Sequence, residues 1–258
     1  VDVGTPTAIG QDGRLIYWNE AGRDVNNAPS ISNYGYDEFW STWESPQPDP
    51  KLGSKVPSWN KSKPETQLDR KDTTAYMVDQ TLDFLRRQGD KPCFITLWPE
   101  DLHTPFNPSE EMLKKHGGKP KANRSLENFY GVLENYDREM GRLAEGLKAL
   151  GAEDNTILIV TGDNGPNPDF DRLRTDGMRG KKATLYEGGI RMPCIIRWPG
   201  HIPAGSENTE TIMSTIDLVP TLTALAGISV VPEAKGQVDG EDLSKAVLGQ
   251  KQQRKNPL

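Results

Sequence analysis

The sequence contains few of the residues that build thiolate or imidazole metal centres. Its 258 residues include two cysteines and three histidines. Cys93 and Cys194 each lie inside an apolar run, where a free cysteine behaves as a small buried hydrophobe. Two buried thiols are therefore expected, with a disulfide or a reactive thiol as the alternatives. So small a number of cysteines does not identify the redox compartment.

Long hydrophobic runs and an excess of one charge are also missing. No stretch reaches the roughly 18 consecutive apolar residues that a membrane-spanning helix needs, and no secretory signal peptide is recognisable at Val1. The net charge of −6 comes from interspersed acidic and basic residues. Neither nucleic acid nor an anionic membrane is therefore expected as a partner. A local cationic pocket for an anionic substrate remains compatible with this charge.

The chain is long enough for one large domain, and its composition changes along its length. Residues 1–70 are predicted to be a loop-rich segment, with a short strand at Arg14–Trp18 and loop over roughly Asn19–Arg70. Residues 71–230 are predicted to form the core domain, and residues 231–258 read as a polar tail. So long a loop inside a compact domain is usually functional or misassigned.

Within the core, helix-like and strand-like patterns alternate. Apolar spacing and caps predict helices over 72–88, 108–116, 126–150 and 215–226. Short continuous apolar runs predict buried strands over Cys93–Trp98, Thr156–Thr161 and Ile190–Trp198. The alternation predicts an α/β fold, a mainly parallel sheet with helices on both faces. Ligands of such sheets bind beyond the carboxyl ends of the strands.

Two candidate ligand groups follow predicted strands. Asp163 and Asn164 leave the second strand into a glycine turn, and together they offer one charged and one neutral oxygen donor. Hard cations such as Ca²⁺ prefer such ligands. The alternative is ordinary turn chemistry, because Asp-Asn-Gly also favours a tight turn.

His103 follows the first predicted strand, before Pro105. A histidine at that place can act as a general acid or bind an oxyanion. A structural or solvated loop histidine is the alternative. The other two histidines are interpreted more simply, His116 as a cation at a helix end and His201 as a loop residue.

A third group lies in the glycine-rich loop that runs from Arg179 to Arg191. Lysine supplies a compact positive charge and arginine a bidentate fork, so both suit a tetrahedral oxyanion. Taken alone, the loop could equally be a solvated basic segment. All three groups fall on the same edge of the predicted sheet, which strengthens each of them.

Several motifs, in this order, resemble the type I (formylglycine-dependent) sulfatases, arylsulfatase-like enzymes of the alkaline-phosphatase-like class. They are Leu102-His103-Thr104-Pro105-Phe106, Thr161-Gly162-Asp163-Asn164-Gly165, the loop 179–193, Arg197-Trp198-Pro199-Gly200 and Ser214–Leu222 with Ala226-Gly227. The match in order and spacing covers roughly residues 28–227, and the combination is far more specific than any single motif.

The resemblance implies a function and a role for each residue. It implies a sulfuric ester hydrolase that uses calcium, with Asp163 and Asn164 as metal ligands. His103 is implied as the catalytic histidine that contacts sulfate and protonates the leaving oxygen. Lys182 is implied as a catalytic and sulfate-binding lysine, and Arg179 as a further substrate contact. The family usually has glycine where this chain has Lys181, so a slipped alignment would make Lys181 the sulfate-binding lysine.

The nucleophile implied by the resemblance is not found. In the family it is a formylglycine made from the first residue of a Cys/Ser-x-Pro-Ser/Ala-Arg motif, which no cysteine or serine here completes. The chain is therefore expected to be a central fragment, without the segment that carries the nucleophile and without the C-terminal subdomain.

Three functional hypotheses follow. The first is a sulfatase acting on a sulfated small molecule or sulfated carbohydrate, periplasmic or secreted as the family implies. The second is a phosphodiesterase or phosphotransferase of the alkaline phosphatase superfamily, which shares the metal-site logic. The third is a catalytically inactive oxyanion-binding fragment, which the missing nucleophile favours.

Overall fold

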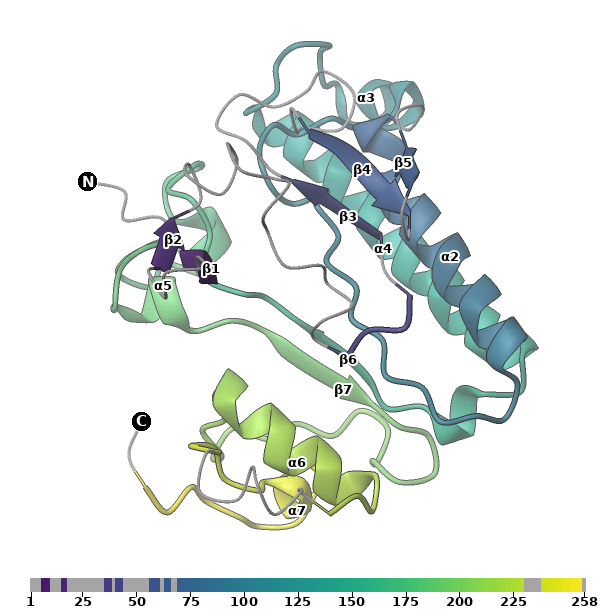
Figure 1. The fold of residues 1–258 in the computed structure, drawn as a ribbon. Helices are drawn as coiled ribbons and strands as arrows, with labels where there is room; N and C mark the ends of the chain where they lie inside the picture. The colour runs from purple at the N-terminus through teal and green to yellow at the C-terminus, as the bar shows by residue number, and fades with distance from the viewer. Residues whose placement is uncertain are drawn as a thin grey trace. The chain divides into compact units, whose positions relative to one another are not determined.

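The computed structural model describes residues 6–9, 15–17, 35–38, 40–43, 56–60, 63–65, 69–229 and 238–256, and for the strands before residue 69 it describes the backbone alone (Figure 1). The chain divides into two compact units, residues 1–143 and residues 144–258. The predicted boundaries at residues 70 and 230 stay a prediction.

The first unit begins with two small antiparallel sheets. β1 (Pro6–Ile9) pairs with β2 (Leu15–Tyr17), which confirms the strand predicted at 14–18. β3 (Trp40–Trp43), β4 (Val56–Asn60) and β5 (Lys63–Glu65) form the second sheet in that order. These three strands fall in the range predicted as loop, so that prediction was wrong for them. They are short and contain two prolines, so a search for continuous apolar runs does not detect them.

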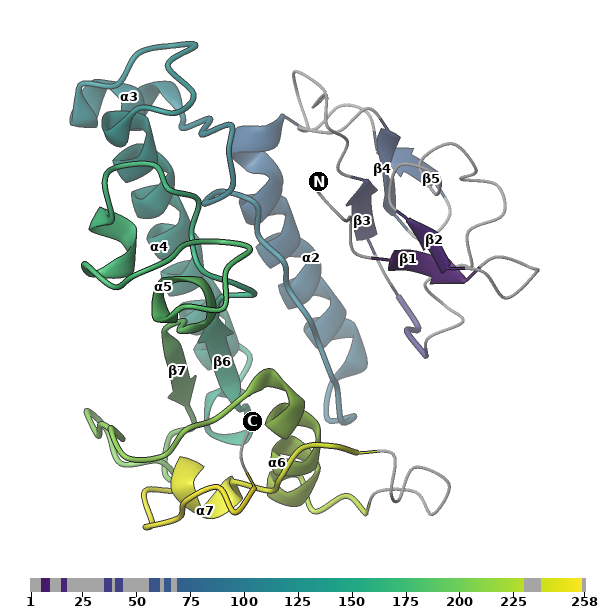
Figure 2. The same cartoon turned by 90° about the vertical axis from the view of Figure 1, so that its left-hand side faces the viewer.

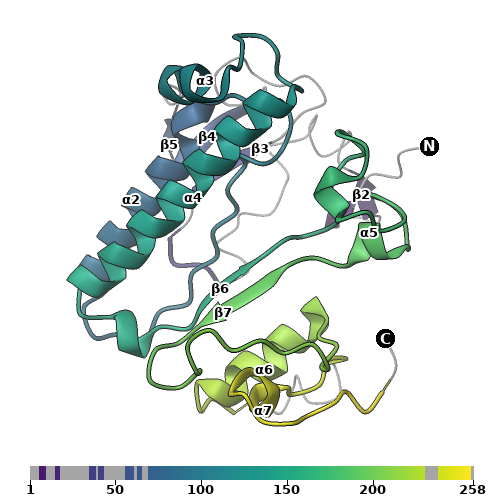
Figure 3. The ribbon, with the colours of Figure 1, turned by 180° about the vertical axis from the view of Figure 1, so that it is seen from behind.

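Three helices follow, close to their predicted bounds. A short 3₁₀ turn, η2 (Arg70–Asp72), leads into α2 (Thr73–Gln88), which ends at Gly89 with φ +60°. α3 (Glu110–His116) is capped by the Ser109 side chain, and α4 spans Leu126–Ala149. α2 and α4 run side by side in three views (Figures 1, 2 and 3). The buried apolar residues of this unit include Val78, Phe106, Phe129 and Val132.

The second unit contains the one strand pair formed by the predicted core strands. β6 (Leu158–Thr161) pairs antiparallel with β7 (Cys194–Arg197), from Leu158 opposite Arg197 to Thr161 opposite Cys194. Figure 3 shows the two strands as the arms of a long hairpin. Every strand pair in the described residues is antiparallel, so the prediction of a mainly parallel sheet is not confirmed. Parallel strands are usually joined by a crossover helix, and the described connection between β6 and β7 has only a short 3₁₀ turn, η4 (Leu173–Thr175), and the four-residue helix α5 (Glu187–Ile190).

The run Cys93–Trp98 was predicted to be a third buried strand of the same sheet, and this prediction was wrong. It has no strand pairing in the described residues, and Phe94 and Trp98 are 71% and 81% exposed. The expectation of buried thiols was wrong as well, because Cys93 and Cys194 are both free and exposed. An apolar run becomes a buried strand only where other strands and helices cover it.

The other regular elements described in the second unit are helical. A short 3₁₀ turn, η3 (Glu153–Asn155), precedes β6, and another, η5 (Thr215–Asp217), leads into α6 (Leu218–Leu225), as predicted for 215–226. α7 (Ser244–Val247) packs against α6 (Figure 2). Asp217 is fully buried and accepts hydrogen bonds from the amides of Ser214 and Glu241, both at 2.8 Å. None of the helices in the described residues is long and apolar enough to cross a membrane.

Candidate functional site

The turn after β6 holds the two predicted metal ligands. At the end of the strand, the Thr161 hydroxyl donates to the Pro193 carbonyl at 3.0 Å, which holds the two arms of the hairpin together. Asp163 and Asn164 follow immediately, and the Asn164 amide nitrogen donates to the Asp163 carboxylate. The two oxygen-bearing side chains therefore lie together on one turn.

This turn is joined to the predicted oxyanion loop by close backbone contact. The amide of Gly165 donates to the carbonyl of Gly189 at 2.9 Å. A Cβ on Gly165 would overlap the Gly188 carbonyl, and a Cβ on Gly189 would overlap the Thr184 carbonyl. Only glycine permits such an approach of two backbones. The glycines of Asp-Asn-Gly and Glu-Gly-Gly are thus two sides of one contact.

A second backbone hydrogen bond places Lys182 beside the turn. Its amide donates to the carbonyl of Pro166 at 2.8 Å, and its side chain is only partly exposed. Lys181 is exposed, and its carbonyl accepts from the amide of Thr184 at 3.1 Å. Of the two candidate lysines, Lys182 is therefore the one bonded directly to the segment that carries Asp163 and Asn164.

Arg179 is engaged within its own loop. Its guanidinium carbon lies 3.8 Å from the centroid of the Tyr186 ring, and Nη2 donates to the Tyr186 hydroxyl at 2.7 Å. Its carbonyl accepts from the amide of Gly188 at 2.7 Å. The stacking of a cation on an aromatic ring is favourable and fixes the direction of the arginine. No pattern in the sequence indicated that Tyr186 would hold it.

His103 belongs to the first unit, whereas the other candidate residues belong to the second. It lies half-buried in the turn after residues 93–98, and its Nδ1 is 2.7 Å from the carbonyl oxygen of Thr104. A carbonyl can only accept, so Nδ1 carries the hydrogen, and Nε2 carries the lone pair of the neutral ring. Nε2 is therefore the nitrogen able to exchange a proton with a substrate.

The two other histidines have the simpler surroundings that the sequence predicted. His116 ends α3, with Nε2 2.6 Å from the Glu134 carboxylate. His201 lies in a loop and stacks on Trp198, with ring centroids 3.7 Å apart. Neither of these contacts involves a predicted metal ligand.

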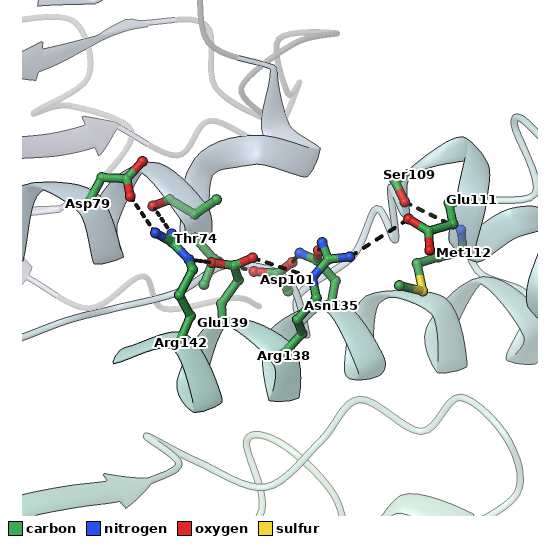
Figure 4. A network of polar contacts seen from close by, with 11 residues as sticks. Thr74, Asp79, Asp101, Ser109, Glu111, Met112, Asn135, Arg138, Glu139 and Arg142 are labelled. Atoms are coloured by element: carbon green, nitrogen blue, oxygen red, sulfur yellow. Dashed lines mark hydrogen bonds and ion pairs between the residues drawn. The ribbon is translucent and has the colours of Figure 1, made fainter. Parts of the chain in front are cut away.

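Two polar residues beneath the His103 turn were missed as functional candidates. Asp101 is buried and accepts from the Thr74 hydroxyl and from the Asn135 amide, the latter at 2.7 Å (Figure 4). Burial raises the pKa of the Asp101 carboxyl above its ordinary value, although both hydrogen bonds act to lower it. Arg70 is 5% exposed and bonds to the same turn. A charged residue at a helix start is normally a surface residue, so its type gave no signal of this burial.

The donor set at Asp163 and Asn164 fits part of a hard-cation site. Carboxylate and amide oxygens are the ligands calcium prefers, and Ca²⁺ takes about six to eight oxygens. In the residues that the structure describes, no group of three or more His, Cys, Asp or Glu side chains could hold a metal ion. Two side chains are too few to complete the coordination, so the remaining ligands would have to be water or other protein groups.

Comparison with known proteins identifies the family. The sequence model of the family described as Sulfatase matches residues 7–228. Rat steryl-sulfatase is 33% identical over 189 residues, which cover 70% of this chain and 31% of the rat protein. Human arylsulfatase A is 34% identical over 179 residues, covering 68% of this chain and 32% of the human protein. The chain thus spans about a third of the length of these relatives.

Solved structures give the same result. The PsFucS1 sulfatase from Pseudoalteromonas sp. superposes with a TM-score of 0.58 and 26% identity, covering 74% of this chain and 39% of that one. The structure of Ps i-CgsB superposes with a TM-score of 0.70 over 96% of this chain and 60% of that chain, at 22% identity, which shows likeness of fold alone. The matched range includes every motif from His103 to Ala226, and the chain belongs to the sulfatase family.

Proposed function

We propose that this chain supplies the sulfate-binding part of the active site of a sulfatase, an enzyme that hydrolyses sulfate esters. The observation that carries the proposal is the hydrogen bond from the amide of Lys182 to the carbonyl of Pro166 at 2.8 Å. It joins a lysine in a basic, glycine-rich loop to the turn of Asp163 and Asn164. A cationic side chain beside oxygen ligands for a metal suits a tetrahedral dianion such as a sulfate group.

Asp163 and Asn164 would hold calcium in this proposal. The contact between their side chains supports it, because both offer oxygens from one turn. A bound dication would supply positive charge to the sulfate oxygens. The role of this chain's own residues is to fix two of the ligands at the end of β6, on a turn that Gly165 locks against Gly189.

Lys182 would bind the sulfate oxygens and stabilise the charge that develops on them. A fixed positive charge stabilises a transition state most when it need not reorganise during the reaction. The backbone bond of Lys182 and its partial burial support such preorganisation. Arg179 is proposed as a further sulfate contact. The guanidinium group has five N–H donors, and its bond to Tyr186 uses one of them.

His103 would protonate the leaving oxygen as the ester bond breaks. The bond of Nδ1 to Thr104 supports this role, because it orients the ring and assigns proton exchange to Nε2. The proposal requires His103, Lys182 and the turn of Asp163 to meet at one substrate. That arrangement is a prediction for the assembled active site.

The nucleophile is proposed to lie outside these 258 residues. None of them completes the Cys/Ser-x-Pro-Ser/Ala-Arg pattern. Formylglycine would supply the attacking oxygen where it is present. The residues described here bind and orient the sulfate ester and provide its leaving group with a proton.

The substrate class is proposed to be a sulfated small molecule or a sulfated carbohydrate. The relatives support both, since they include steryl-sulfatase and N-acetylgalactosamine-6-sulfatase, the latter of human origin and 31% identical over 181 residues. A structurally similar protein, Ps i-CgsB, has also been solved in complex with k-i-k-neocarrahexaose. A periplasmic or secreted location remains a prediction.

The experiment compares sulfate and phosphate esters. The product of the complete reading frame is expressed with formylglycine maturation and assayed with 4-nitrophenyl sulfate and bis(4-nitrophenyl) phosphate. We expect sulfate-ester turnover to exceed phosphodiester turnover by about 100-fold or more, as a site shaped for one transition state should discriminate. The matched control is Lys114→Ala, a lysine on α3 outside the candidate site, which should leave both rates unchanged.

The alternative functions give different outcomes in the same assay. A phosphodiesterase would reverse the preference between the two substrates. An inactive oxyanion-binding protein would turn over neither substrate but would still bind inorganic sulfate, measured by calorimetry. Loss of sulfate binding in Lys182→Ala together with absent turnover would identify this third case.

A further inference from the structure

Arg70 is a buried cation with an unusual set of partners. It is 5% exposed and begins the short turn that leads into α2. A guanidinium group taken out of water is costly unless its donors find acceptors. The acceptors that bind Arg70 therefore identify the segment that its buried side chain holds in place.

The side chain of Arg70 bonds to a single short turn, residues 100–103. Nη1 donates to the Glu100 carboxylate at 3.2 Å. Nη2 donates to the main-chain carbonyls of Glu100 and His103, at 3.2 Å and 3.1 Å. The amide of His103 itself donates to the Glu100 carbonyl at 3.0 Å, which closes the turn. The guanidinium thus spans the turn from its first residue to the histidine.

The same turn is fixed from its other side by Asp101. Its carboxylate accepts from the Thr74 hydroxyl on α2 and from the Asn135 amide on α4 (Figure 4). Asn135 in turn accepts from Arg138 at 2.6 Å. The residues on both sides of Leu102 are therefore tied to η2, α2 and α4, and the position of the His103 main chain follows from these bonds.

The position of the His103 main chain also controls its ring. Nδ1 donates to the carbonyl of the next residue, Thr104, at 2.7 Å. This bond is made between neighbouring residues, so it survives only while the backbone at 103 and 104 keeps its dihedral angles. A shift of the His103 carbonyl rotates the peptide that follows it and moves the acceptor.

We propose that Arg70 is a positioning residue for His103: it holds the His103 carbonyl and thereby selects the Nδ1–H form of the ring, with Nε2 directed to proton exchange. The catalytic consequence rests on the proposed function, whereas the effect on the histidine tautomer does not. Misplacement of a reacting group by about 1 Å can cost about 10²-fold in rate.

The first test reads the tautomer directly. The 258-residue chain is labelled with ¹⁵N-histidine, and long-range ¹H–¹⁵N spectra are recorded at pH 8, with the His103 signals identified by their loss in His103→Gln. We expect the Nδ1–H form in the parent chain and a mixture of tautomers in Arg70→Lys, whose ammonium group cannot replace the fork. Glu100→Gln is the matched variant: it removes the ion pair but keeps both carbonyl bonds, so it should retain the Nδ1–H form.

Two results at His103 would overturn the proposal. One is an unchanged His103 tautomer in Arg70→Lys. The other is an equal loss in Glu100→Gln, which would assign the effect to the ion pair. His201 serves as an internal reporter, because its Nδ1 bonds to the Pro199 carbonyl at 3.1 Å. Loss of the His201 Nδ1–H signal in Arg70→Lys would also contradict the proposal, because it would show that Arg70 stabilises the fold as a whole.

The second test uses turnover by the product of the complete reading frame. Arg70→Lys should lower kcat by about 10- to 100-fold and change KM by less than about threefold, because the substrate contacts remain. In a His103→Gln background the same change should have little further effect. A parent protein without sulfatase activity would remove the proposed function and leave the tautomer result to decide the role of Arg70. An active parent, together with an unchanged His103 tautomer in Arg70→Lys, would contradict the role of Arg70 and leave the proposed function standing.

Discussion

The amide of Lys182 donates a hydrogen bond to the carbonyl of Pro166 at 2.8 Å. The two residues are separated by a connection that includes a run of left-handed, non-glycine residues, Phe170, Asp171 and Arg172. Because the bond closes this connection, the lysine loop returns to the turn that carries Asp163. The charge of the loop and the side-chain oxygens of Asp163 and Asn164 are therefore held together by backbone contacts, which do not depend on a bound ligand.

Replacement of the two neighbouring lysines should give unequal results. Lys182→Ala is expected to lower sulfate-ester turnover by about 10²-fold or more, the usual loss for one stabilising group. Lys181→Ala should change it by less than about threefold, because Lys181 is exposed and its backbone bonds remain with Thr184. Steady-state kinetics on the product of the complete reading frame measure both. A larger effect at Lys181 would show that the slipped alignment is the right one.

Gly165→Ala should destabilise the second unit. The added Cβ would overlap the Gly188 carbonyl, and overpacking of this kind costs about 1–3 kcal/mol. Gly141→Ala is the control: it lies in α4 with no atom within 4 Å of the added Cβ, and alanine there should stabilise by about 0.5–1 kcal/mol. Urea unfolding of both variants gives the comparison. An unchanged midpoint for Gly165→Ala would mean that the two backbones do not touch in solution.

Asp101 should give the first unit a distinctive pH dependence. Burial raises the pKa of its carboxyl in the folded protein above 3.8, the ordinary value. The folded state therefore binds more protons than the unfolded state in this range, and stability falls as pH rises. The contribution is fully present below about pH 3.8 and is lost as pH rises through the folded pKa.

The measurement is the difference in unfolding free energy between the parent and Asp101→Asn at several pH values from about 3.5 to 7. Asparagine does not titrate, and it keeps an oxygen acceptor for Asn135. We expect the parent to lose stability relative to the variant as pH increases. A parent that gains stability relative to the variant as pH rises would indicate a lowered pKa and would contradict the burial argument.

The helices and the turn at Asp163 were predictable from the sequence because their signals are local. Asp72 before α2 and Gly89 after it, or Ser109 and Gly117 around α3, specify the ends of a helix within a few residues. The sequence Asp163-Asn164-Gly165 likewise specifies a turn by itself. These elements were predicted to within a few residues.

Strand pairing was not predictable, because it is decided by partners far away in the chain. The run Cys93–Trp98 is apolar enough for a buried strand, yet nothing in it states which strand would bond to it. The antiparallel register of Thr161 with Cys194 depends on the path of the loop between them. Arg70 was missed for the same reason, since its burial follows from a turn that lies 30 residues further on.

Calcium binding by the 258-residue chain should be weak. Asp163 and Asn164 supply two ligand side chains, whereas calcium takes about six to eight oxygens, so water would have to complete the shell. We expect a dissociation constant above about 10⁻⁴ M in titration calorimetry, and a further loss of about tenfold in Asp163→Ala. Asp154→Ala, on the 3₁₀ turn before β6, is the control and should have no effect. Tight binding by the chain alone would show that other residues within it complete the site.

The 258-residue chain by itself should hydrolyse sulfate esters negligibly. An activated nucleophile divides a difficult displacement into two easier steps, and no cysteine or serine in the chain stands in the motif that is matured to formylglycine. In the proposed function Lys182 stabilises charge and His103 transfers a proton, but neither replaces that attack. Aryl-sulfate turnover of the chain is therefore compared with that of the matured product of the complete reading frame, at equal concentration. In that product His103→Ala should lower turnover by about 10²-fold or more, as expected for the loss of a general acid. Robust turnover by the chain alone would overturn the proposed mechanism, because one of its own residues would then have to be the nucleophile.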